Sequence, residues 1–172
     1  MAVNLSVYQL RHDDLAETVR GTLHRHGIDA GLLALEITES AAMERPEQAI
    51  ARLRDLRDMG IELAIDDFGT GYSSLAYLQS LPLQSLKLDR AFVRDLEHNP
   101  GDAAISAATV ALAHKLGLAV IAEGVETAGQ AAFLLAQGCD VLQGNRYGEA
   151  APAAFWEQHW RAHSDAEVAG GR

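Results

Sequence analysis

The chain of 172 residues contains one cysteine, Cys139, and no apolar run of about 18 residues. A single cysteine excludes an internal disulfide and suits a reducing compartment, and we expect the thiol to be buried as a small apolar group at the start of a strand. The missing apolar run excludes a transmembrane helix, and no signal-peptide pattern follows Met1. These absences predict a soluble, cytoplasmic chain without direct membrane insertion, and a membrane-anchored full-length parent remains compatible with them.

Basic side chains are also few. The sequence has 14 Lys and Arg against 24 Asp and Glu, a net charge of −10. This balance argues against a nucleic-acid polymer or an anionic membrane as the main partner, and it is compatible with a site that gathers carboxylates around cations. Apolar residues make up 48% of the chain, so we expect one folded domain rather than disorder.

Short apolar runs alternate with amphipathic stretches along the chain. The expected strands are residues 32–37, 61–65, 83–88, 119–122 and 139–142. The expected helices are one that ends at Gly27, one from Pro46 to Gly60, one capped by Asp102 that ends at Gly117, one that begins with the capping-box spacing of Thr127 and Gln130, and one over about 153–163. Strands that alternate with helices predict βα units and a parallel sheet.

Polar residues fall at the ends of these apolar runs, or one step beyond them. They are Asn4, Glu36, Asp66 with Asp67, Lys87 with Asp89, Glu123 and Gln143. Successive gaps from Glu36 are 30, 21, 36 and 20 residues, each about one βα unit. Because all carboxyl ends of a parallel sheet lie on one side, we expect these side chains to converge there, where α/β enzymes place their chemistry.

The converging groups are oxygen donors and one ammonium, a set that desolvation would not tolerate without cations. Oxygen donors without cysteine or histidine select Mg²⁺ or Mn²⁺ over zinc. The adjacent pair Asp66 and Asp67 allows one carboxylate to bridge two ions, and ions about 3.5–4 Å apart clamp both oxygens in phosphoester hydrolysis. Lys87 is expected to orient a water or stabilise charge on phosphate, and Glu123 to accept a proton.

The loop after the aspartates contains Gly69 and Gly71, which let the backbone bend closely around such a site. Ser73 or Ser74 is then expected to cap a short helix. Plainer interpretations of single motifs exist. The aspartate pair alone is compatible with a helix-capping turn. Glu36 and Glu39 alone are compatible with a solvated strand end, and Lys87 and Asp89 could form an ordinary surface ion pair. The seven histidines have no metal-ligand spacing, and we expect surface or packing roles for them.

Taken together, the motifs resemble the EAL-domain family, bacterial phosphodiesterases that hydrolyse cyclic di-GMP to linear pGpG. The matching segments are Asn-Leu-Ser at 4–6 with Gln9, LEITES at 35–40, DDFGTGYSS at 66–74, LKLDR at 86–90, AEGVE at 122–126, and 138–144. The resemblance covers about residues 1–160. It implies a TIM-like (β/α)₈ barrel of EAL type whose first strand runs antiparallel to the others.

The resemblance also implies roles for individual residues. Asn4, Glu36 and Asp66 would ligate one metal ion, with Asp66 bridging to a second ion held partly by Asp67. Lys87 and Glu123 would position and activate water. The supporting residues it implies are Gln143 in the water or metal network, Glu39 bracing the loop with Gly69, Thr70 and Gly71, and Asp89 as an additional ligand or neighbour of the ligands.

Two departures from the family pattern stand out. The Glu-Ala-Leu motif belongs on a strand upstream of the one that ends at Asn4, and the chain begins three residues before Asn4. We therefore expect an incomplete barrel of about six of eight strands, because a complete one has about 250 residues. The family also tends to continue after Gly144 with an aromatic residue and later a basic residue and proline, whereas residues 145–151 read NRYGEAA.

Six strands cannot close a barrel, so the outer strands would expose unpaired edges. We expect a fragment or alternative-start product with a partial EAL domain at 1–163 and a polar tail at 164–172. We expect it to be weakly active alone and to form homodimers or aggregates, with sensory or diguanylate-cyclase-like domains in the full-length protein. The leading hypothesis is cyclic di-GMP hydrolysis. The alternatives are a cyclic di-GMP-binding domain without turnover and, more remotely, an unrelated metal-dependent barrel hydrolase.

Overall fold

The computed structural model describes residues 1–69 and 75–159. Within these ranges six strands form one sheet in chain order, and every neighbouring pair is parallel. The strands are β1 (Ala2–Asn4), β2 (Ala34–Thr38), β3 (Glu62–Phe68), β4 (Ser85–Leu88), β5 (Ala119–Ala122) and β6 (Val141–Leu142). The predicted α/β architecture with parallel βα units is confirmed.

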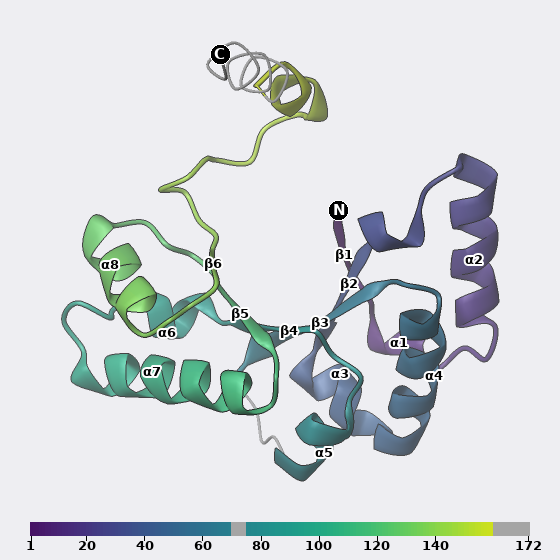
Figure 1. Cartoon of the computed structure of the whole chain (residues 1–172), viewed down its shortest axis with the longest axis horizontal. Helices are drawn as coiled ribbons and strands as arrows, with labels where there is room; N and C mark the ends of the chain where they lie inside the picture. Colours follow the sequence, from purple (N-terminus) through teal and green to yellow (C-terminus); the bar gives the residue numbers. More distant parts are fainter. Residues whose placement is uncertain (70–74, 160–172) are drawn as a thin grey trace, which may run out of the picture.

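Helices connect successive strands and flank the sheet (Figure 1). They are α1 (Val7–Leu10), α2 (Leu15–His26), the 3₁₀ helix η1 (Ala30–Leu32), α3 (Glu39–Glu44), α4 (Pro46–Asp58), α5 (Leu75–Ser80), α6 (Arg90–Arg94), α7 (Pro100–Lys115) and α8 (Ala128–Ala136). Residues 153–159 form a further helix, drawn away from the sheet in Figure 1. Over the ranges that the structure describes, each helix is too short or too polar to cross a membrane.

The strands separate apolar from polar side chains by simple alternation. In β2, Leu35 and Ile37 are buried in the core together with Leu53 of α4, whereas Glu36 lies on the opposite face. This second face is the one that the wall of a complete barrel would enclose. The alternation therefore directs Glu36 away from the helical layer and toward the interior of the curved sheet.

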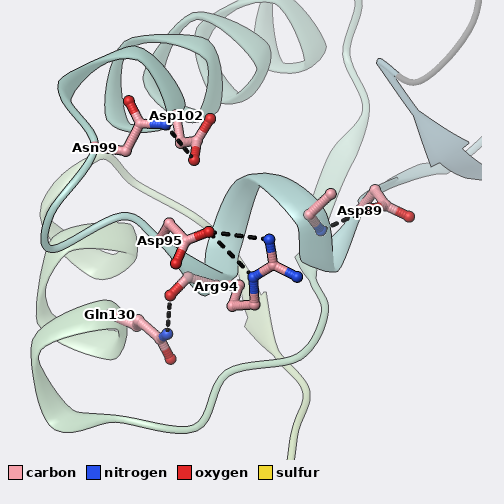
Figure 2. Close-up of polar contacts among 7 residues, drawn as sticks. Asp89, Arg94, Asp95, Asn99, Asp102 and Gln130 are labelled. Carbon is pink, nitrogen blue, oxygen red and sulfur yellow. Dashed lines mark hydrogen bonds and ion pairs between the residues drawn. The ribbon is translucent and has the colours of Figure 1, made fainter.

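Helix starts follow local side-chain chemistry, with one correction to the sequence prediction. Thr127 and Gln130 form the predicted capping box at the start of α8. The prediction that Asp102 caps α7 is wrong, because Asn99 is the N-cap and its side chain accepts from the Gly101 amide at 2.9 Å. Asp102 instead accepts a hydrogen bond from the Asn99 side chain at 2.9 Å (Figure 2).

Four strands, β2, β3, β4 and β6, begin one or two residues later than the sequence predicts. Leu32 belongs to η1 and is 66% exposed, and β2 begins only at Ala34. At the edge of the sheet, β6 begins at Val141, two residues after Cys139. The thiol of Cys139 is buried, as predicted, and it donates to the carbonyl oxygens of Val120 and Val141 at 3.4 Å each.

The sheet has two open edges among the described residues. The strand order begins at β1 and ends at β6, and no pairing joins these two strands. Beside β1 lies a groove of about 280 Å³ whose lining includes Val3, Leu5, Val19 and Leu35. An open sheet of six strands is what the sequence predicts for an incomplete barrel.

Candidate active site

A buried lysine lies at the centre of the polar face of the sheet. The ammonium nitrogen of Lys87 is 2.8 Å from Glu36 Oε2, 3.2 Å from Asp66 Oδ1 and 2.7 Å from Glu123 Oε1. The Lys87 side chain is only 5% exposed. Four side chains from β2, β3, β4 and the residue after β5 therefore form one compact ionic cluster, which we call the Lys87 cluster.

Strand register explains why these four residues meet. Asp66 lies two residues beyond the partner of Glu36 on β3, and Glu123 lies two residues beyond the partner of Lys87 on β5. Alternate residues of a strand share a face, and parallel strands place their carboxyl ends on one side. The backbone amide of Glu123 also donates to the Leu88 carbonyl at 3.1 Å, which extends the pairing past the end of β5. The cluster is thus a product of sheet pairing.

The environment of Lys87 keeps it protonated. Burial by itself lowers the pKa of an ammonium, but hydrogen bonds to Glu123 and Glu36 and the charge of Asp66 outweigh it. The net effect raises the pKa of Lys87 above its usual range. Lys87 is therefore a fixed positive charge at neutral pH and is not suited to accept a proton.

The two aspartates occupy a β-bulge. Between paired positions, β3 advances three residues from Ile65 to Phe68 while β4 advances two, so β3 carries one extra residue. Asp67 has φ of 56°, in the left-handed region that aspartate tolerates better than most residues. Its amide donates to Asp66 Oδ1 at 3.0 Å. The bulge separates the two side chains. Asp66 contacts Lys87, whereas Asp67 contacts Asp89.

Asp67 meets another carboxyl group. Burial raises the pKa of Asp67, and so do its hydrogen bond with Asp89 and the negative charges of Asp66, Asp89 and Glu123. Two carboxyl groups in contact require a shared proton or a cation between them. The Asp67–Asp89 contact is thus a place where a cation would relieve repulsion.

Glu39 supports the turn that follows the bulge. The residue is 3% exposed, and its Oε2 accepts from the Gly69 amide at 3.1 Å. Its other oxygen, Oε1, is buried and has no hydrogen-bond partner among the residues that the structure describes. Gly69 has φ of 98°, and a β-carbon there would come within 3.0 Å of the Phe92 ring. Thr70, Gly71 and the serines at 73 and 74 lie outside the described residues.

The remaining predicted residues lie at the carboxyl ends of strands of the same sheet. Asn4 is exposed and pairs in register with Glu36 on the neighbouring strand. Gln143 is exposed, and its backbone carbonyl accepts from the Val125 amide at 3.0 Å. Asp89 has a structural contact as well, because it caps α6 by accepting from the Ala91 amide at 2.6 Å.

The donor set suits a hard dication. The carboxylates of Glu36, Asp66 and Asp67 offer only oxygen, the ligand type that Mg²⁺ and Mn²⁺ prefer. The carboxyl contact between Asp67 and Asp89 supports this fit, because a cation would remove its repulsion. No group of three or more His, Cys, Asp or Glu side chains within residues 1–69 and 75–159 has the geometry of a metal site, and the ammonium of Lys87 lies between the carboxylates instead.

The sequence did not predict two contacts of α6, a hydrogen bond from Gln130 and the packing of Arg90 against Gly124. Gln130, identified only as part of a capping box, also donates from Nε2 to the carbonyl oxygen of Arg94 at 3.0 Å. Arg90 was assigned no contact, yet a β-carbon on Gly124 would come within 2.7 Å of its Cβ. These contacts join residues 36 apart (Gln130 and Arg94) and 34 apart (Arg90 and Gly124), so no local pattern in the sequence indicates them.

The fold and the site define an α/β protein with an open parallel sheet and an acidic, lysine-centred cluster at the carboxyl ends of its strands. The model of the EAL domain family matches residues 1–150, and the chain belongs to this family. It is 48% identical over 153 residues to the bifunctional diguanylate cyclase/cyclic di-GMP phosphodiesterase MucR of Pseudomonas aeruginosa, with 89% of this chain and 22% of MucR covered. It is 45% identical over 163 residues to the cyclic di-GMP phosphodiesterase NbdA of the same organism, with 95% of this chain and 21% of NbdA covered.

Solved structures agree with the family assignment. The MucR phosphodiesterase in complex with c-di-GMP superposes with a TM-score of 0.87 at 48% identity, covering 90% of this chain and 63% of that one. Klebsiella pneumoniae BlrP1, solved with c-di-GMP and manganese or calcium, gives a TM-score of 0.77 at 34% identity, covering 84% of this chain and 37% of that one. The chain thus spans about a fifth of the length of the curated relatives and less than two thirds of the MucR phosphodiesterase structure.

Proposed function

We propose that this chain carries the chemistry of a cyclic di-GMP phosphodiesterase, hydrolysing cyclic di-GMP to linear pGpG with two Mg²⁺ or Mn²⁺ ions. The Lys87 cluster is the observation that supports the proposal most directly. It places two kinds of group at one point, acidic side chains able to hold dications and a permanent ammonium able to face a phosphate. Membership of the EAL family and its cyclic di-GMP-bound relatives support the choice of substrate.

The chain's own residues divide into ligands and reacting groups. Asn4, Glu36 and Asp66 would hold one ion, and Asp66 with Asp67 the second, with Asp89 close enough to Asp67 to assist. When bound, such ions supply Lewis-acid polarisation of the phosphodiester. Asp66 would serve both ions, because its strand pairs with β2, which carries Glu36, and Asp67 is the next residue along β3.

Lys87 and Glu123 would act on water and phosphate. Because the pKa of Lys87 is raised, its ammonium keeps its charge and can stabilise the negative charge that develops on the phosphoryl oxygens. Glu123, 2.7 Å from that ammonium, is placed to take a proton from the attacking water. The water oxygen would bond to phosphorus as one phosphorus–ribose oxygen bond breaks, with one water proton passing to Glu123. The departing ribose oxygen would take a proton from solvent to become a hydroxyl group, and Glu123 would return its proton to solvent.

Glu39 and Gln143 would support this arrangement without reacting themselves. Glu39 holds the amide of Gly69 in the turn after Asp67, and it would brace the loop to which Thr70 and Gly71 belong. Gln143 lies at the end of β6 and would contribute to the water or metal network. Their contribution is to orientation, because neither side chain contacts the Lys87 ammonium among the described residues.

We further infer that the chain functions beside other domains, of sensory or diguanylate-cyclase-like type. MucR is bifunctional, and the matched segment is about a fifth of its length. The domain limits at 163, the polar tail, the cytoplasmic location and self-association through open sheet edges remain predictions of the sequence.

The test is product analysis with the purified chain, cyclic di-GMP and Mn²⁺ or Mg²⁺. Linear pGpG supports the proposal, whereas binding without product supports a cyclic di-GMP-binding domain that lacks turnover. Asp66→Asn is expected to abolish hydrolysis because it weakens both ion sites, and Asp55→Asn, at an exposed position of α4, is the matched control. Turnover retained in Asp66→Asn would remove its bridging role.

A further inference from the structure

The short helix α6 contacts the backbone that follows two other strands. Its ring at Phe92 lies over Gly69, where an added β-carbon would come within 3.0 Å of the ring. Its first residue, Arg90, packs on Gly124, where an added β-carbon would come within 2.7 Å of the Arg90 Cβ. Gly69 follows the aspartate bulge and Gly124 follows Glu123. A shift of α6 therefore displaces the backbone next to the aspartate bulge and the backbone next to Glu123.

The first residue before α6 is itself one of the predicted site residues. Asp89 caps the helix through the Ala91 amide at 2.6 Å (Figure 2). Asp89 also shares a hydrogen bond with Asp67. The helix is five residues long, so its orientation depends on what holds each end rather than on its own hydrogen bonds.

Gln130 holds the far end of α6. Its side-chain Nε2 donates to the carbonyl oxygen of Arg94 at 3.0 Å, a bond drawn in Figure 2. Its Oε1 accepts from the amides of Glu126 at 2.7 Å and Thr127 at 2.9 Å. Gln130 is 3% exposed, and all three hydrogen bonds are partly buried. One side chain thus links the end of α6 to the loop that begins at Glu123.

These hydrogen bonds are costly to lose. The last carbonyl groups of a helix have no partner within the helix, and one that is partly buried and left without a partner is destabilising. The amides of Glu126 and Thr127 depend on the same side chain. A second contact joins the same two segments. The Thr127 hydroxyl donates at 2.6 Å to Oε2 of Glu97, which follows α6 in the chain.

We propose that Gln130 is a positioning residue for the hydrolysis proposed above: through α6 it holds the aspartate bulge and Glu123 at their working separation. This inference rests on the proposed function. In the part of the chain that the structure describes, the Gln130 side chain bonds to the Arg94 carbonyl and to the amides of Glu126 and Thr127, and none of these is a proposed metal ligand.

Gln130→Glu removes the hydrogen bond to α6 and keeps the hydrogen bonds to Glu126 and Thr127. The carboxylate still accepts from Glu126 and Thr127, so the start of α8 keeps its cap, but it cannot donate to Arg94. We expect kcat for cyclic di-GMP to fall about tenfold with KM within about twofold, because misplacement of reacting groups slows chemistry more than binding. Gln137→Glu makes the same chemical change at the exposed end of α8 and is expected to leave both constants unchanged.

Hydrogen exchange gives a second measurement that does not depend on turnover. In Gln130→Glu the amides of residues 90–94 are expected to exchange faster than in Gln137→Glu, while those of Glu126 and Thr127 stay protected. Equal exchange in the two variants, or equal kcat, overturns the positioning role. Absence of pGpG from the unmodified chain overturns the proposed function, and the exchange comparison then still decides whether Gln130 holds α6.

Discussion

Replacing Lys87 with methionine tests whether the Lys87 ammonium offsets the repulsion among the carboxylates of the Lys87 cluster. Methionine keeps most of the volume and removes the charge, which leaves Glu36, Asp66 and Glu123 facing one another without a cation. Removing one partner of a buried ionic group costs about 3–5 kcal/mol. The three carboxylates are 12–21% exposed, so water compensates in part and we expect the lower end, about 3 kcal/mol.

Calorimetry measures this loss directly. For a chain of this size 1 kcal/mol corresponds to about 2–4 °C in Tm, so Lys87→Met should melt about 9 °C below the unmodified chain when metal is removed by EDTA. Lys115→Met, at an exposed position of α7, is the matched control and should melt within about 1 °C of the unmodified chain.

Metal addition sharpens the test. In the unmodified chain Mn²⁺ must compete with the ammonium for Glu36 and Asp66, whereas in Lys87→Met it meets carboxylates that lack a counter-ion. Mn²⁺ should therefore raise Tm more in Lys87→Met than in the unmodified chain. An equal or smaller rise, or a metal-free Tm equal to that of Lys115→Met, would show that Lys87 does not balance these carboxylates.

Two further predictions concern other parts of the fold. Gly124→Ala should lower Tm more than Gly117→Ala, because both residues have positive φ (69° and 75°) and cost about 1–2 kcal/mol each, but only at Gly124 would the β-carbon also meet Arg90, at 2.7 Å. Equal losses of Tm would mean that α6 moves freely away from Gly124. The hydrogen bond from His114 lowers the pKa of Asp140 below its ordinary 3.8, so this carboxylate stabilises the fold above pH 3.8 and loses that contribution as pH falls through its lowered value. The Tm difference between the unmodified chain and Asp140→Asn should therefore shrink below pH 3.8, and a constant difference in melts from pH 7 to 2.5 would contradict this.

The sequence predicted the parts of the molecule that depend on sheet register. Polar residues spaced by one βα unit must reach the same end of a parallel sheet, and Glu36, Asp66, Lys87 and Glu123 do so. The bulge was not predictable, because nothing in an Asp-Asp pair indicates which of the two adopts positive φ. The metal-binding and catalytic roles of these residues remain predictions.

Helices α6 and α7 show where patterns in the sequence lose information. α6 has five residues, and its position depends on contacts with Gly69, Gly124 and Gln130, which are distant in the chain. The cap of α7 was misassigned because Asn99 and Asp102 are both good N-caps, and the choice between them depends on where Pro100 places the first turn. Tertiary contacts thus decide the position of α6, whereas a local choice between two capping residues decides where α7 begins.

The burial of Cys139 makes the chain convenient for spectroscopy. Desolvation raises the pKa of its thiol, so little thiolate is present at neutral pH, and the sulfur is covered by the sheet. Since the sequence has no other cysteine, a thiol introduced at an exposed position such as Ala91 would be labelled selectively without removal of the native one. A fluorescent or spin probe on α6 would then report its motion during nucleotide addition in an otherwise unmodified protein.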